Sequence, residues 1–251
     1  MIFFTGVFVL KHAEKVDYAF ISINRLIGVN RRKSDFSCKT WIMDSGAFSQ
    51  VCNSGDHVLS PLEYACQIKR WSRCGILLRA VSQDYMCEDF ILEKSGKSVL
   101  EHQEMTIERY DQLLAGMDLI DCDVGIMPVI QGYSPESFQE CVCMYGSRLK
   151  QNQWVGVGSI ASRAKEPELV LDVLDAIREV RPDLRLHGFG VKVRCLQDER
   201  IRNHLFSADS MAWSFAARYR GRVSDVNEAL RFQERINVMP VQSAFNFGDS
   251  I

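Results

Sequence analysis

The stretch "WIMDSGAFSQ", residues 41–50, decides the fold, because it ends an apolar run on a carboxylate, a hydroxyl and a glycine. Three apolar residues lead directly into Asp44, and Ser45 and Gly46 follow it. A strand that stops in this way holds a reactive group at a fixed place, and a turn of small residues lets a ligand approach the backbone. Taken alone, the same pattern also suits a strand followed by a turn that Asp caps. The rest of the chain has to decide between these two interpretations.

Apolar runs of strand length recur along the 251-residue chain, separated by segments with helical periodicity. Eight such runs cover residues 2–9, 18–24, 40–46, 77–84, 124–132, 154–160, 184–190 and 205–213. Helices are predicted at 60–74, 134–149, 166–180 and 223–236, with Ser60, Ser134 and Ser224 as caps. Eight strands that alternate with helices in about 250 residues are typical of a (β/α)8 barrel. We therefore predict an α/β fold, a TIM-like (β/α)8 barrel that forms a single domain over residues 1–251, with a doubly wound open sheet as the alternative.

Nearly every one of these runs ends in a polar residue or a glycine. The ends are Asn24, Asp44 with Ser45, Asp84, Gln131 with Gly132, Gly158 with Ser159, Gly188 with Gly190, and Asp209 with Ser210. In a parallel barrel the carboxyl ends of the strands converge at one mouth, where enzymes of this fold keep their active sites. The repeated pattern therefore favours the interpretation of Asp44 as an active-site residue.

Three carboxylates are then expected at this mouth, from Asp44, Asp84 and Asp209. Two carboxylates on either side of a substrate are what glycosidic-bond chemistry uses: one attacks or stabilises the anomeric carbon, and the other moves protons. The third can accept hydrogen bonds from the N–H groups of a base. Gln131 can both donate and accept on a base edge, and Phe48 is either a ring that stacks on a flat ligand or a core residue.

Composition places the chain among soluble globular proteins, with 47% hydrophobic and 25% charged residues. No apolar run approaches the roughly 20 residues of a membrane helix, so no membrane partner is expected. The segment "MIFFTGVFVLKHAEK", residues 1–15, has no basic residue before its apolar part, and we predict a first strand there and not a signal peptide. The nine cysteines are scattered without a disulfide-like spacing, which indicates a reducing cytoplasm.

The net charge of −2 argues against a general nucleic-acid binder, but the charges are unevenly distributed. Residues 80–140 hold 13 acidic and 3 basic side chains, a balance of −10, whereas residues 185–222 hold 8 basic and 3 acidic ones, a balance of +5. A local basic face can bind phosphates on an acidic protein, although a solvated surface is the plainer interpretation. The candidates for phosphate contacts are Arg25, Arg31, Arg32, Lys33, Lys192, Arg194, Arg218, Arg220 and Arg222.

An ordered set of short motifs resembles the tRNA-guanine transglycosylases and their DNA-modifying relatives, the DpdA-type 7-deazaguanine DNA transglycosylases. The segment "DSGAF" (44–48) is similar to the family's "DSGGF/Y", and "SQDY" (82–85) to the segment with its base-recognising Asp. Similarly, "PVIQG" (128–132) resembles "VVQG", and "VGVGSIASR" (155–163) resembles "AIGGLAVGE". "LHGFGV" (186–191) resembles "LMGVG", and "SADSMAWS" (207–214) lies where the family has its nucleophile segment. Together these motifs span roughly residues 40 to 215.

The resemblance implies a role for each matched residue. Asp209 is implied as the nucleophile that attacks C1′ of the target guanosine, and Asp44 as the general acid and base. Ser45, Asp84, Gln131, Ser159 and the backbone at Gly158 are implied to read the base edge. Phe48 and His187 are implied to sandwich the ring, although a strand-end histidine with a local hydrogen bond is an equal alternative for His187. The implied reaction replaces guanine by a free 7-deazaguanine base, such as 7-cyano-7-deazaguanine, and needs no cofactor.

The sequence also departs from the family pattern. Ala47 and Ser159 stand where the family has glycines, and Arg163 falls near its usual glutamate, which leaves the identity of the incoming base open. The tRNA enzymes carry a zinc subdomain after the last catalytic strand, and no cysteine follows residue 213 here. Cys141 and Cys143 lie upstream without partners at zinc-ligand spacing, so we expect no structural zinc and no metal ligands.

The missing zinc subdomain makes the chain more similar to the compact, often phage-linked enzymes that act on DNA. We expect DNA as the partner, tRNA as the alternative, a target guanine flipped out of the duplex, and a bacterial or phage-infected cytoplasm. A helper protein is a possible further partner. Two other interpretations remain: a non-catalytic nucleic-acid-binding subunit, and an unrelated metabolic barrel with "GFGVK" (188–192) as its phosphate loop.

Overall fold

Parallel strands form the centre of the molecule, and helices surround them. The computed structural model describes residues 1–29, 36–163, 166–219, 221 and 225–238. Its strands are β1 (Ile2–Gly6), β2 (Tyr18–Ser22), β3 (Thr40–Asp44), β4 (Ile76–Val81), β5 (Ile126–Met127), β6 (Val129–Ile130), β7 (Trp154–Val157), β8 (Arg185–Gly188) and β9 (Leu205–Ser210). They pair in the order β5-β4-β3-β2-β1-β9-β8-β7-β6, and every pair is parallel.

The two ends of this sheet are neighbours in the chain, because only Pro128 separates β5 from β6. β5 pairs with β4 through Ala80 opposite Ile126, and β6 pairs with β7 through Val129 opposite Gly156. Pro128 has no N–H to donate, so the run at 124–132 divides into two short strands. β5 and β6 together occupy the place of one barrel strand, and the sheet is therefore a nearly closed barrel. The predicted TIM-like barrel is thereby confirmed, and the open sheet is excluded.

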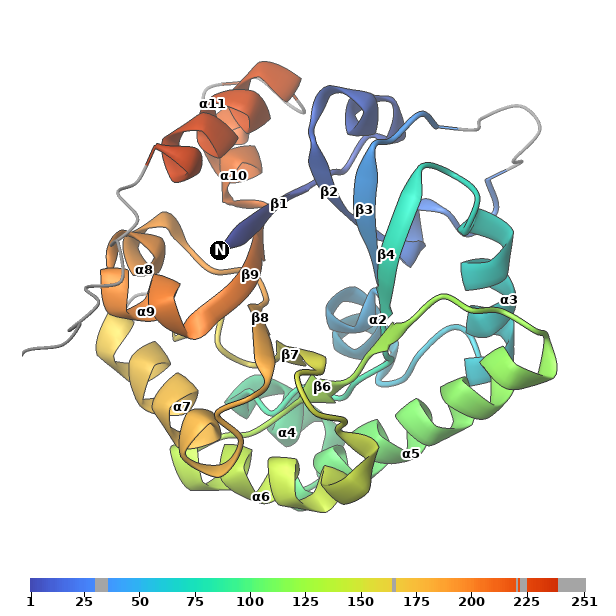
Figure 1. Ribbon diagram of the computed structural model, residues 1–251, viewed down its shortest axis with the longest axis vertical. Coiled ribbons are helices and arrows are strands. Elements are labelled where there is room, and N and C mark those ends of the chain that lie inside the picture. The colour runs from blue at the N-terminus through green and yellow to red at the C-terminus, as the bar shows by residue number, and fades with distance from the viewer. Residues whose placement is uncertain (30–35, 164–165, 220, 222–224, 239–251) are drawn as a thin grey trace, which may run out of the picture.

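The helices lie outside the ring of strands, as Figure 1 shows for α3, α5, α6, α7 and α11. Their bounds are α2 (Ala47–Ser54), α3 (Pro61–Trp71), α4 (Asp89–Ser95), α5 (Val99–Leu119), α6 (Pro135–Tyr145), α7 (Pro167–Val180), α8 (Val193–Gln197), α9 (Glu199–His204), α10 (Ala212–Tyr219) and α11 (Val226–Asn237), with short 3-10 turns η1 (Leu10–Lys15), η2 (Ile23–Arg25) and η3 (Gly146–Arg148). The predicted caps Ser60 and Ser134 form capping boxes on α3 and α6. The N-cap of α11 is Asp225, and the predicted cap Ser224 lies outside the described residues.

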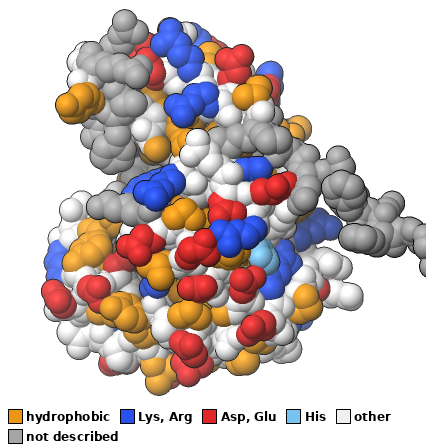
Figure 2. Space-filling view, turned by 90° about the vertical axis from the view of Figure 1, so that its left-hand side faces the viewer, with side chains coloured by type: hydrophobic (Ala, Val, Ile, Leu, Met, Phe, Trp, Pro, Cys, Tyr) orange, Lys and Arg blue, Asp and Glu red, His pale blue; other side chains and the backbone are white. Residues whose placement is uncertain are grey.

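Acidic and basic side chains are interspersed on the face that carries α7, α8 and α9 (Figure 2). On these elements the Arg200 guanidinium pairs with Glu168 at 2.5 Å and with Asp198 at 2.7 Å. The described part of this face therefore mixes both charges, as solvated helix surfaces usually do.

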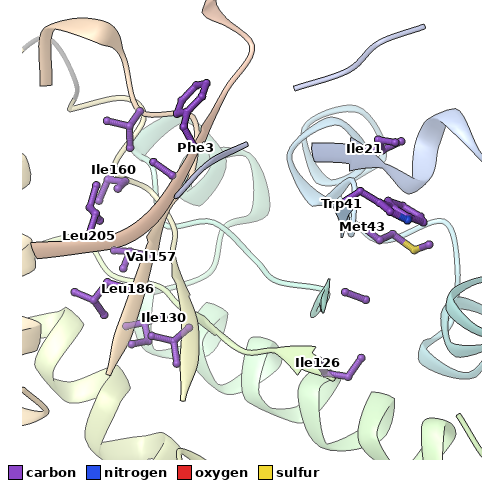
Figure 3. Packing of buried hydrophobic residues seen from close by; sticks show 14 of the residues in the cluster. Phe3, Ile21, Trp41, Met43, Ile126, Ile130, Val157, Ile160, Leu186 and Leu205 are labelled. Carbon is purple, nitrogen blue, oxygen red and sulfur yellow. The ribbon is translucent and has the colours of Figure 1, made fainter. Parts of the chain in front are cut away.

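Side chains alternate between the two sides of the barrel wall. Trp41 and Met43 point outward into the core between strands and helices, and Figure 3 shows them there together with Ile21. Ile42, between them in sequence, points inward and packs with Phe4 and other residues inside the barrel. Each strand thus contributes side chains both to the core between strands and helices and to the interior of the barrel, as its period of two residues requires. The interior side chains fill the barrel below the mouth.

No group of three or more His, Cys, Asp or Glu side chains is placed to hold a metal ion within the described ranges. Cys141 is buried and Cys143 is exposed, so the two thiols of this pair lie on different sides of α6. No helix in the described part of the chain is long and apolar enough to span a membrane.

Candidate active site

A cavity of about 360 Å³ opens at the carboxyl ends of the strands. Strand-end residues from around the barrel contribute to its lining: Asn24, Asp44, Asp84, Gln131, Gly158, Ser159, Gly190 and Asp209. The convergence that the sequence predicted for these residues is therefore observed, and a purine base fits the volume of the cavity.

The turn after β3 is built around Gly46, which has a φ of +73° and caps the start of α2. A Cβ at this glycine would lie 2.4 Å from Nδ2 of Asn24, which donates to the Gly46 carbonyl at 3.2 Å. The Gly46 N–H donates to Oδ2 of Asp44 at 3.1 Å. Only glycine suits this conformation and this close approach, and the turn fixes the direction of the Asp44 carboxyl group.

The carboxyl groups of Asp44 and Asp209 both line the cavity. Burial and, to a smaller extent, the Asp209 carboxylate raise the pKa of Asp44 to about 6, against hydrogen bonds from Ser22 and the backbone that lower it. A carboxyl group with this pKa exchanges protons readily near neutral pH, which suits a general acid and base.

Asp209 is the next-to-last residue of β9, and its carboxylate is held through one of its two oxygens. Oδ1 accepts the Gly190 N–H at 3.0 Å and lies 3.4 Å from Nε2 of His187. Nδ1 of His187 lies 2.8 Å from the Ser207 hydroxyl, which accepts the indole N–H of Trp154 at 2.8 Å. All these groups are satisfied when Ser207 donates to Nδ1 and His187 donates from Nε2 to Asp209.

His187 lies below the cavity and is fully buried. Its ring stacks on Phe20, with centroids 5.5 Å apart and planes at 15°, and Phe189 approaches it to 4.9 Å. The implied sandwich of a base between Phe48 and His187 does not match this position, because aromatic side chains already cover the imidazole. Its place next to Asp209 corresponds to the alternative of a strand-end histidine with a local hydrogen bond.

One side of the cavity is a polar wall formed by Asp84, Gln131 and Ser159. The Cys87 N–H donates to the Ser159 hydroxyl at 2.9 Å, and that hydroxyl donates to Oε1 of Gln131 at 2.7 Å. Nε2 of Gln131 then donates to Oδ2 of Asp84 at 2.5 Å. This chain of donors fixes the Gln131 amide in one orientation.

Backbone conformation contributes to the same wall. A Cβ on Gly158 would lie 2.2 Å from Nε2 of Gln131, so only glycine leaves room for the amide. Ser159 adopts a φ of +52°, which is uncommon for a residue with a side chain. Ser45 supports Asp84 from behind, with its hydroxyl 3.5 Å from Oδ1, and is itself buried.

Burial raises the pKa of Asp84 to about 7. The hydrogen bond from Gln131 lowers it, and the carboxylates of Asp44 and Glu88 raise it. A buried carboxyl group with a raised pKa lacks the hydrogen bonds that water would donate to its ionised form. A ligand with N–H donors supplies those hydrogen bonds, so the site favours such a ligand.

The segment 82–88 that carries Asp84 has no regular structure, and residues 82–87 are buried. Side chains satisfy its backbone. His57 approaches the Asp84 carbonyl at 3.0 Å through Nε2, His102 approaches the Met86 carbonyl at 2.6 Å through Nδ1, and the Tyr85 N–H donates to Thr106 at 2.9 Å. Both histidines must donate, because carbonyl oxygens only accept. Burial lowers the pKa of both imidazoles, that of His57 to about 4.

Several residues that line the cavity were not predicted from the sequence. Glu88 lies four residues beyond Asp84; burial raises its pKa, and its Oε2 has no hydrogen-bond partner among the described residues. Phe20, Phe189 and Met211 also line the cavity. None of these residues ends a strand on a polar group, so the pattern that revealed the wall gave no signal for them.

The predicted phosphate contacts are only partly described. Arg25 lines the cavity, Lys192 is half-buried before α8, and Arg194 is exposed on it. The others lie outside the residues, or the side chains, that the structure describes: Arg31, Arg32, Lys33, Arg218, Arg220 and Arg222. Of the three candidates whose side chains the structure describes, Arg25 alone lines the cavity.

The arrangement combines a pair of coupled carboxylates with a preorganised donor and acceptor wall, which is suited to holding a base while its glycosidic bond is broken. A scan against protein-family models matches residues 10–236 to the model described as DpdA, DeoxyPurine in DNA protein A. A search of curated proteins finds no match.

Proposed function

This chain belongs to the DpdA family of the tRNA-guanine transglycosylase superfamily, which is implicated in inserting 7-deazapurines into DNA, and on that premise we propose that it catalyses the exchange itself. The reaction replaces guanine in DNA by a 7-deazaguanine, such as 7-cyano-7-deazaguanine, through a covalent glycosyl-enzyme. The observation that carries this proposal is that Asp44 and Asp209 face the same cavity as the polar wall.

We assign the nucleophile to Asp209. Its Oδ1 is held by Gly190 and His187, whereas no hydrogen bond to Oδ2 is found among the described residues. Oδ2 attacks C1′ of the target nucleotide, and the C1′–N9 bond breaks as the C1′–O bond forms. His187 is a positioning residue in this scheme, because it orients the carboxylate without touching the base.

We assign proton transfer to Asp44. In its protonated form it donates to N9 of the departing guanine, and the resulting carboxylate then takes the proton from N9 of the incoming 7-deazaguanine. That nitrogen attacks C1′, the bond to Asp209 breaks, and the carboxylate is restored. A pKa of about 6 keeps both forms of Asp44 populated near neutral pH.

We assign recognition of the base to the polar wall. A guanine edge carries N–H donors at N1 and N2, which the Asp84 carboxylate accepts, and an oxygen at position 6, which Gln131 and the backbone at Gly158 and Ser159 approach. Ser45 supports Asp84 in this role. Phe48, which is exposed and lines the cavity, supplies one stacking face for the ring.

Base exchange with radiolabelled guanine tests the proposal. The purified protein is incubated with duplex DNA, single-stranded DNA and tRNA, and we expect label to be retained in DNA. Asp209→Asn should retain no label and trap no covalent adduct, whereas the exposed control Asp111→Asn should behave as the unmutated protein.

Three results would contradict the proposal. Label in tRNA alone would make the tRNA the substrate. Label in no nucleic acid, with guanine and with 7-cyano-7-deazaguanine, would indicate a non-catalytic binding subunit. Substantial exchange by Asp209→Asn would refute the nucleophile.

A further inference from the structure

Four large aromatic side chains remain exposed on connections that follow different strands. Phe8 is 43% exposed after β1, Phe48 is 60% exposed after β3, Phe90 is 50% exposed after β4, and Tyr133 is 44% exposed after β6. Because the carboxyl ends of parallel strands meet at one mouth, these residues belong to the same end of the barrel as the cavity. We call these four residues the aromatic rim.

The contacts within the aromatic rim support this placement. Phe8 and Phe48 line the cavity itself. Phe90 approaches Phe48 edge-on, with ring centroids 6.4 Å apart and planes at 70°. The rim is therefore continuous with the cavity that receives the base in the proposed reaction.

Cations lie over two of the rings. The Arg25 guanidinium is 3.5 Å from the centroid of Phe8, and the Arg163 guanidinium is 5.8 Å from that of Tyr133. Arg163 also donates to the Ser159 carbonyl at 3.2 Å, which ties this part of the rim to the polar wall. Aromatic faces interleaved with guanidinium groups are the arrangement that binds unpaired nucleotides, whose bases stack and whose phosphates are anionic.

Exposed aromatic rings need a reason when they gather at one place, because burial in the core would be more favourable. At this mouth the core is complete: Phe4, Phe20 and Trp154 already fill the inside of the barrel below the cavity. The ring faces that the guanidinium groups leave uncovered thus remain available to a partner that brings flat apolar surfaces with attached negative charge.

We propose that the aromatic rim binds the bases on either side of the target guanine by stacking, so that the DNA at the site is unpaired beyond the single flipped nucleotide. This inference rests on the proposed function and goes beyond it, since a flipped base alone would occupy only the cavity. The expected substrate preference is a bubble or a single strand over a fully paired duplex.

Equilibrium binding tests the inference separately from catalysis. The probe is a DNA with 2-aminopurine next to the target guanine, presented as a single strand, as a bubble and as a duplex. Stacking of the reporter on the rim should change its fluorescence when the unmutated protein binds. Phe90→Leu and Phe8→Leu should each weaken binding to the single strand and the bubble about 5-fold or more, the scale of one lost base–aromatic stack.

The matched control is Leu119→Ala, whose side chain is 74% exposed. Leu119 is the last residue of α5, which leads into the start of β5 and so ends on the side of the barrel opposite the mouth. This variant should leave all three affinities unchanged. Binding of free guanine to Phe90→Leu should also be unchanged, because Phe90 does not line the cavity and the polar wall is intact.

Two results would overturn the inference: rim variants that bind all three DNAs as the unmutated protein does, and equal losses for the duplex and the unpaired forms. The first result would leave the rim as a surface for a protein partner. Failure of the proposed function has a different signature, because an unmutated protein that binds neither guanine nor 7-cyano-7-deazaguanine would refute it whatever the rim variants do.

Discussion

The polar wall and the aromatic rim belong to the same mouth but are built in opposite ways. Asp84, Gln131 and Ser159 of the wall are buried and joined by hydrogen bonds of 2.5 and 2.7 Å. The rings of the rim are about half exposed, and Phe90 and Phe48 touch only at an edge. The wall therefore has its geometry before a ligand arrives, whereas the rim acquires its contacts from the partner.

The difference follows from backbone chemistry. The segment that carries Asp84 is buried without regular structure, and a buried N–H or C=O without a partner costs free energy. Side chains from elsewhere must bond that backbone, and each one fixes the segment further. Phe8 and Phe90 are instead about half exposed, on the connection after β1 and in the first turn of α4, where the backbone needs no such buried network.

Breaking the wall should have the largest effect. Asp84→Ala removes the acceptor for the base and leaves the Gln131 amide unpaired, at about 1–3 kcal/mol for the unpaired group alone. We expect kcat/KM for the incoming base to fall about 10²–10³-fold, measured by guanine exchange into DNA.

The affinity of this variant for single-stranded DNA should stay close to that of the unmutated protein, because the rim is untouched. A loss of exchange below 10-fold, or an equal loss of DNA affinity, would show that wall and rim do not divide recognition in this way.

The raised pKa of Asp84 also predicts a stability effect. The folded protein holds this proton to about pH 7, whereas the unfolded chain releases it near 3.8, the ordinary pKa of an Asp carboxyl group. Asp84 therefore lowers stability as the pH rises from about 4 to about 7, and its contribution is level above that. Asp44, with a pKa of about 6, acts in the same direction.

Asp84→Asn removes this ionisation and keeps an acceptor for Gln131. The variant should gain about 2 kcal/mol relative to the unmutated protein between pH 5 and pH 8, measured by denaturant unfolding without ligand. A gain that is the same at both pH values would mean that Asp84 ionises normally in the folded protein.

His57 offers a smaller and more selective change to the wall. His57→Leu removes the donor to the Asp84 carbonyl, and we expect KM for the base to rise about 10-fold with little change in kcat. His57→Gln keeps a donor at a similar reach and should restore most of the affinity. His12→Leu, a half-buried histidine on η1, is the matched control. Equal behaviour of the Leu and Gln variants would show that His57 only fills space.

The sequence was sufficient to place the wall at the mouth, because its members follow directly on strands: Asp84 lies three residues beyond β4, and Gln131 is the first residue after β6. Apolar runs that stop near these residues indicate the carboxyl end of the barrel. The direction of the Asp84 side chain depends on the irregular segment 82–88. His57 lies between α2 and α3 and His102 lies on α5, and their function arises only where these elements approach the segment at 82–88. No local pattern encodes that approach.

His187 shows a further limit of the same kind. Its ring lies inside the barrel next to Phe4 and Trp154, and its height along the barrel axis decides whether it reaches the cavity. It pairs in register with Ser207, one layer below Asp209. The motif identifies His187 and its neighbours in sequence. The layer of the barrel interior that its side chain occupies depends instead on the stagger between β8 and β9, including the register shift at Leu186.

The smallest expected effect is the coupling between wall and rim. The contacts described for His57 involve Asp56, Asp84 and Tyr85, and those for Phe8 involve Arg25, so the two sets have no residue in common. Changes at independent sites add to within about 0.5 kcal/mol. In His57→Leu with Phe8→Leu, the loss in kcat/KM for exchange into single-stranded DNA should equal the product of the two single losses to within about 2-fold. A larger deviation would mean that flanking bases held by the rim set the position of the target base against the wall, and recognition would then be one coupled event instead of two separable ones.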